Sequence, residues 1–138
     1  MMSGMNARVE PATNRLLVVA SDAEFRDAAA GIAERLGYEL YSTGYSADFR
    51  KIVLNLVPTV VILDVDLLNK QRTGALAFLA RLDFRPRILL LSSPELQGDV
   101  SLQELVNSLS LDVVEILSHP VDLDKLDRTM QSLRLVED

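Results

Sequence analysis

The chain has 138 residues, a length that suits one domain large enough to bury a core. Hydrophobic residues make up 49% of it and aromatic residues only 5%, so the core must be built from Leu, Val, Ile and Ala. The net charge of −6 argues against nucleic-acid binding, and the lack of cysteine, with His119 as the single histidine, excludes disulfides and Cys/His zinc clusters.

Residues 1–14 lack hydrophobic periodicity and carry Gly4, Asn6 and Pro11, which predicts a loose tail ahead of one domain over residues 15–138. No apolar run is long enough to span a bilayer, and no secretory signal is recognisable. We therefore expect a cytoplasmic protein that does not contact a membrane.

Strand-like and helix-like segments then alternate five times, which is typical of a parallel sheet with helices on both faces. Strands are expected at 16–20, 38–42, 60–64, 88–91 and 113–117, and helices at 21–36, 46–57, 74–82, 95–109 and from 123 onward.

Several residues predict where these helices begin and end. Ser21 and Glu24 have the spacing of a capping box, and Gly37 would end the first helix. Ser46 would cap the second helix, and Asp122 the last one. Four apolar residues of the last helix should form its buried face: Leu123, Leu126, Met130 and Leu133.

The segment Val60-Val61-Ile62-Leu63 ends abruptly in Asp64, as expected for a buried parallel strand that leaves the core at a carboxylate. Ligands and chemistry in open α/β sheets collect beyond the carboxyl ends of strands. Ser92 and His119 follow two other strands, so we expect them near Asp64.

The chain resembles a receiver domain of bacterial two-component signalling over residues 15 to about 135. The resemblance rests on Leu16–Val19, Val61–Asp64, Ile88–Ser92 and, most strongly, Ile116–Leu126. The last segment is similar to the family's ending, in which a Lys-Pro bond is usually cis. The resemblance implies a flavodoxin-like (βα)5 fold with a parallel sheet of order 2-1-3-4-5.

The resemblance also implies roles for individual residues. Asp64 matches the aspartate that accepts a phosphoryl group from a histidine kinase. Ser92 matches the switch hydroxyl, with Ser93 as a one-residue shift, and His119 takes the place of the conserved lysine. Ile116 stands at the aromatic switch position.

Magnesium ligands are fewer than the family pattern requires. The backbone carbonyl of Asp66 matches one ligand position beside Asp64, but the acidic pair falls on Ala20 and Ser21, which leaves only Asp22. Because Mg²⁺ prefers carboxylate oxygens, we expect weakened binding of this cofactor. Imidazole is also shorter than lysine and largely neutral near pH 7.

We therefore expect an atypical receiver, standing alone or cut from a longer protein, rather than an enzyme. Its Mg²⁺-dependent phosphorylation at Asp64 would be weakened or lost. Its partners would be a histidine kinase or another signalling protein, and the resemblance implies an interface, in some cases a homodimer, on the face formed by the fourth helix, fifth strand and fifth helix.

Two alternatives come from other functional classes. Asp64-Val65-Asp66 resembles the nucleophile and general acid of haloacid-dehalogenase-type phosphatases, with Ser92 as a later phosphate contact. The second alternative is a flavodoxin-like module that binds a nucleotide or a flavin. It is disfavoured because no Gly-rich loop follows the first strand, where residues 20–24 are acidic.

Overall fold

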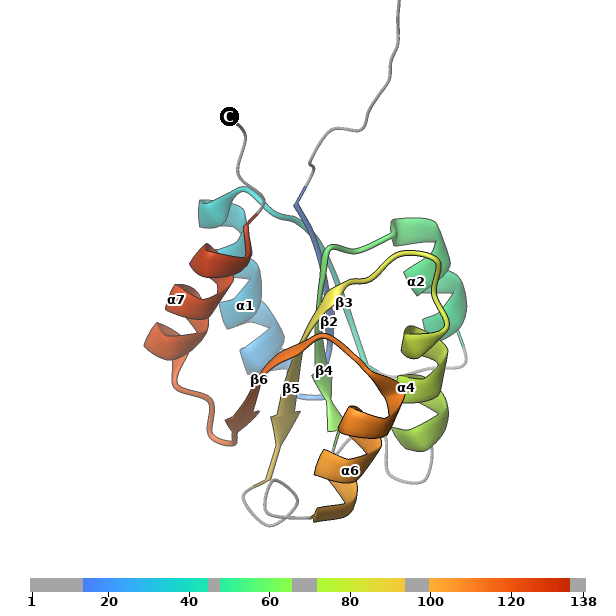
Figure 1. Ribbon diagram of the computed structural model, residues 1–138. Coiled ribbons are helices and arrows are strands. Elements are labelled where there is room, and N and C mark those ends of the chain that lie inside the picture. Colours follow the sequence, from blue (N-terminus) through green and yellow to red (C-terminus); the bar gives the residue numbers. More distant parts are fainter. Residues whose placement is uncertain (1–13, 45–47, 66–71, 94–99, 135–138) are drawn as a thin grey trace, which may run out of the picture.

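A computed structural model describes residues 14–44, 48–65, 72–93 and 100–134 (Figure 1). Its strands are β2 (Arg15–Val19), β3 (Glu39–Thr43), β4 (Val60–Asp64), β5 (Arg87–Ser92) and β6 (Val113–Ser118). Its helices are α1 (Ala23–Leu36), α2 (Phe49–Leu56), α4 (Arg72–Ala80), α6 (Val100–Leu109) and α7 (Leu123–Leu133). The strands form one parallel sheet of order β3-β2-β4-β5-β6, which confirms the flavodoxin-like fold and the order 2-1-3-4-5.

Helices cover both faces of this sheet: α1 and α7 pack on one face, and α2, α4 and α6 on the other (Figure 1). Alternate residues of the strands enter the two cores, as Leu16 and Leu17 illustrate in β2. All five residues of β4 are buried. The unbroken apolar pattern before Asp64 thus arises because both faces of this strand are covered.

The start of α1 differs from the prediction. Its N-cap is Asp22, whose carboxylate accepts a hydrogen bond from the Glu24 amide at 2.9 Å, so the expected Ser21 capping box is wrong. Asp is as good an N-cap as Ser, and the helix simply begins one residue later. Gly37 ends α1 as predicted, with φ of 86° and its amide directed at the last turn.

The last helix is capped by Asp122, as predicted, through bonds from the amides of Asp124 and Lys125. Three of the four expected inward residues are buried, namely Leu126, Met130 and Leu133. Leu123 was wrongly assigned to that face, because its position in the first turn leaves it 45% exposed.

Most other bounds lie within two residues of the prediction, and α2 begins three residues later than expected. The expected cap Ser46 lies outside the described residues, and α2 begins after Asp48. The first part of the expected fourth helix, 95–99, and the tail 1–13 also lie outside them. Among the described residues, no helix combines the length and the apolar character needed to cross a bilayer.

Candidate functional site at the carboxyl edge of the sheet

Asp64 and His119 meet at the carboxyl edge of the sheet. Asp64 is the last residue of β4, and its side chain is 9% exposed. His119 follows β6 directly, and its Nε2 lies 3.3 Å from Asp64 Oδ2. A protonated imidazole at this distance forms an ion pair with the carboxylate. A buried carboxylate needs such a partner because desolvation alone would destabilise it.

The backbone around His119 fixes where its ring lies. The His119–Pro120 peptide bond is cis, and the His119 amide donates to the Ser92 carbonyl at 3.0 Å. This bond extends the pairing of β5 with β6 by one residue beyond Ser92 and Ser118, which are register partners. The imidazole is therefore held at the edge by the sheet itself.

Ser92 occupies the position that the sequence predicted for it. It comes one residue after Leu91, the register partner of Asp64, and it is fully buried. Its hydroxyl donates to the Ser93 carbonyl at 3.1 Å. The role of Ser92 as a switch, and the alternative Ser93, stay predictions.

The side chain of an α1 arginine, which the sequence patterns did not single out, reaches the end of β2. The Arg26 guanidinium, from the first turns of α1, turns back so that Nη1 donates to the Ala20 carbonyl at 2.6 Å and to the Ser21 carbonyl at 3.2 Å. These two residues hold the positions of the acidic pair in the resemblance. A guanidinium thus binds the main-chain oxygens where carboxylates would bind a metal ion.

Several solved structures with a similar fold are response regulators or their receiver domains. The chain superposes on a response regulator from Thermotoga maritima with a TM-score of 0.71 at 15% identity, covering 88% of this chain and 97% of the other. A signal receiver domain of a DNA-binding response regulator from Colwellia psychrerythraea 34H gives 0.71 at 16% identity, covering 87% and 97%. A signal receiver domain from Bermanella marisrubri gives 0.69 at 19%, covering 88% and 98%. The chain has the receiver fold.

The resemblance to receivers stated from the sequence is thereby confirmed at the level of the fold. No family model matches the sequence, and neither does any curated protein. At 15–19% identity these structures establish the fold of this chain. The chemistry of the site depends on the residues that this chain itself has there.

The residues at this edge fit a receiver's magnesium ion poorly. Ala20 has no oxygen on its side chain, and the Asp22 carboxylate serves the N-cap of α1. Asp66, whose carbonyl was a candidate ligand, lies outside the described residues. Within the described part of the chain, no group of three or more His, Asp or Glu residues is arranged to hold a metal ion. Weak magnesium binding therefore stays a prediction, and the described residues provide no matching set of ligands for the ion.

Proposed function

We propose that this protein is a signalling domain with the receiver fold in which Mg²⁺-dependent phosphorylation of Asp64 is weakened or lost. One observation carries the proposal: His119 Nε2 lies 3.3 Å from Asp64 Oδ2, at the position where a receiver has its lysine. The imidazole thus stands beside the Asp64 carboxylate where the longer, fully charged lysine would reach a phosphoryl oxygen. The protein then acts by binding a histidine kinase or another signalling protein, not as an enzyme.

Charge supports the same conclusion. Phosphoryl transfer needs cations around the transferred oxygens, supplied in most such sites by metal ions and lysine or arginine. Here the Arg26 guanidinium donates hydrogen bonds to the carbonyls of Ala20 and Ser21. At these two positions the side chains offer one hydroxyl, that of Ser21, and no carboxylate. A divalent cation at the end of β2 would be repelled by this guanidinium. It would also find no carboxylate at positions 20 and 21, although Mg²⁺ prefers carboxylate ligands.

The test is phosphorylation of the purified chain by acetyl phosphate at millimolar Mg²⁺, followed by intact mass. In an active receiver, an Asp64 oxygen would attack phosphorus, an acyl phosphate would form and acetate would leave. We expect little or no gain of a phosphoryl group. A receiver with ordinary acids and lysine serves as the positive control.

A full gain of one phosphoryl group that disappears in Asp64→Asn would overturn the proposal. The phosphatase alternative with Asp64 and Asp66 receives no support from the fold comparisons. Steady hydrolysis of an aryl phosphate, lost in Asp64→Asn, would revive it.

The proposed contact surface is the face of α6, β6 and α7, with a second copy of the chain as the first candidate partner. β6 ends the sheet, and Val114 on this strand is 41% exposed. Sedimentation at rising concentration should reveal a dimer that Val114→Asp weakens. Leu54→Asp is the matched control, because Leu54 is 55% exposed on α2, a helix outside the proposed surface (Figure 1). A monomer at every concentration would contradict the homodimer and leave another protein as the partner.

A further inference from the structure

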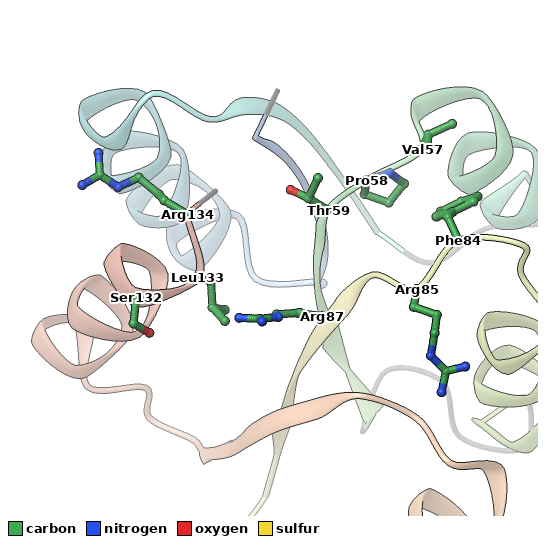
Figure 2. A pocket seen from close by; sticks show the side chains of 9 residues that line it. All are labelled: Val57, Pro58, Thr59, Phe84, Arg85, Arg87, Ser132, Leu133 and Arg134. Carbon is green, nitrogen blue, oxygen red and sulfur yellow. The ribbon is translucent and has the colours of Figure 1, made fainter. Parts of the chain in front are cut away.

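A cavity of about 440 Å³ lies at the amino edge of the sheet, the end opposite Asp64. Figure 2 shows its three walls: the turn that leads into β4, the segment that leads into β5, and the end of α7. These segments are far apart in the sequence, so no local motif marks the cavity. Its volume lies in the range of about 300–1,000 Å³ that is usual for small-molecule sites.

The described residues that line the cavity carry positive charge only. They include Arg85, Arg87 and Arg134 and no carboxylate, in a chain whose net charge is −6. Three of the chain's 14 basic residues are thus among those that line one cavity. Such a concentration against the overall charge favours a negatively charged ligand.

Two of these arginines are anchored by the backbone. Arg85 Nη2 donates to the Ser110 carbonyl at 2.8 Å, and Arg134 Nη1 donates to the Leu36 carbonyl at 3.4 Å. Figure 2 shows both side chains directed away from Arg87, so they add positive charge around the cavity and leave Arg87 as the arginine that can contact a ligand inside it.

Arg87 is the arginine that extends across the cavity. Its guanidinium reaches toward Leu133 in Figure 2. Its Nε lies 3.8 Å from Asp112 Oδ2, and both side chains are about half exposed, at 53% and 50%. An ion pair so long and so exposed is weak, so an incoming anion can compete for the guanidinium. The planar group then offers two parallel N–H donors to an oxyanion.

Of the other lining residues, Thr59 and Ser132 are polar and four are apolar. Pro58, Phe84 and Leu133 line the cavity between the arginines. An inorganic anion would leave these walls in water and fill a small part of the volume. A ligand with a ring or other apolar body behind its charged group would cover them.

We propose that this cavity binds a small organic phosphate, with the phosphate on Arg87 and the apolar body against Phe84 and Leu133. The site is separate from the Asp64 edge, so it goes beyond the function proposed above and does not depend on it. Binding here involves no transfer of the phosphoryl group.

The probe is phenylphosphonate, whose carbon–phosphorus bond prevents transfer to Asp64. It is titrated into the ¹⁵N-labelled full chain, and amide shifts are followed by NMR. We expect saturable shifts at Thr59, Phe84 and Arg87, with Asp64 and Ser92 unmoved. Inorganic phosphate should bind more weakly, because it leaves the apolar walls uncovered.

The decisive variant is Arg87→Gln, which keeps a polar side chain and removes the charge. Affinity should fall at least about tenfold, as expected when a charged hydrogen bond is lost. Arg85→Gln should weaken binding less, and Arg128→Gln, an exposed arginine of α7 that does not line the cavity, should leave it unchanged. The proposal is wrong if shifts do not saturate, if they centre on the Asp64 edge, if inorganic phosphate binds equally well, or if a folded Arg87→Gln protein keeps its affinity.

Discussion

The Tyr38 hydroxyl donates a hydrogen bond to the Met130 carbonyl, 2.7 Å away, and joins the start of β3 to the last turn of α7. This carbonyl is one of the last four of its helix, where regular partners run out, and the Arg134 amide bonds to Gln131 instead. The buried phenol of Tyr38, 92 residues away in the sequence, donates the hydrogen bond that this carbonyl would otherwise lack. The bond ties the segment between α1 and β3 to the end of α7.

Tyr38 should make the domain lose stability at high pH. Burial raises the pKa of its phenol to about 12, against a smaller lowering by Arg134, whereas the unfolded chain keeps about 10. The folded state therefore favours the protonated phenol. The resulting stability is complete below about pH 10 and is lost as the pH rises through about 12.

Denaturant unfolding of the wild type and Tyr38→Phe between pH 8 and pH 12 measures this contribution. At pH 8 the variant should be less stable by about 1 kcal/mol, the value of one hydrogen bond. Above pH 10 the difference should shrink, because only the wild type loses this contribution. A constant difference across the range would contradict the assignment.

Much of the fold follows from sequence patterns because those patterns are local. Val60–Asp64 was predicted with its bounds, since a strand covered on both faces is apolar throughout and its end is marked by a charge. The cis bond before Pro120 was expected from the resemblance of the segment around it.

Features that depend on which segments meet in space were harder to predict. Arg26 was missed because an arginine in a helical turn reads as a solvated residue until its side chain is seen folded back on the carbonyl of Ala20. The arginines at 85, 87 and 134 gather only once the sheet and α7 are assembled. Ser21 and Asp22 are both good caps, so the sequence could not choose between them.

The corrected face of α7 leads to a second prediction. Leu126 is fully buried, whereas Leu123 on the same helix is 45% exposed. Leu126→Ala should lower the free energy of unfolding by about 2–5 kcal/mol, because it removes packed methyl groups and leaves a cavity. Leu123→Ala should change it by no more than about 0.5 kcal/mol. Urea unfolding of the two variants distinguishes them, and equal losses would place Leu123 in the core after all.

Asp22 offers a test of capping against metal binding. Its carboxylate accepts the Glu24 amide, so Asp22→Ala should destabilise the domain by about 1 kcal/mol whether or not Mg²⁺ is present. A metal ligand would behave differently, since Mg²⁺ would stabilise the wild type and not the variant. Thermal unfolding with Mg²⁺ or EDTA separates the two roles. Asp27→Ala, an exposed acid of the same helix, is the control.

Restoring the missing charges should restore the chemistry. The variant combines Ser21→Asp, Arg26→Gln and His119→Lys, which adds a carboxylate at the end of β2, removes the guanidinium from its carbonyls, and places a longer, fully charged side chain beside Asp64. Acetyl phosphate with Mg²⁺ should then add one phosphoryl group to more of the protein than in the wild type, because cations again surround the transferred oxygens.

Adding Asp64→Asn to this triple variant should abolish the mass gain, and Arg128→Gln in the wild type should produce none. Each single change is expected to do less than the three together, because the carboxylate and the vacated carbonyls would hold Mg²⁺ while the lysine and the metal ion stabilise the same phosphoryl group. If the folded triple variant is phosphorylated no more than the wild type, the contacts of Arg26 and His119 are not what limits Asp64. The cause would then have to be sought in the residues after β4.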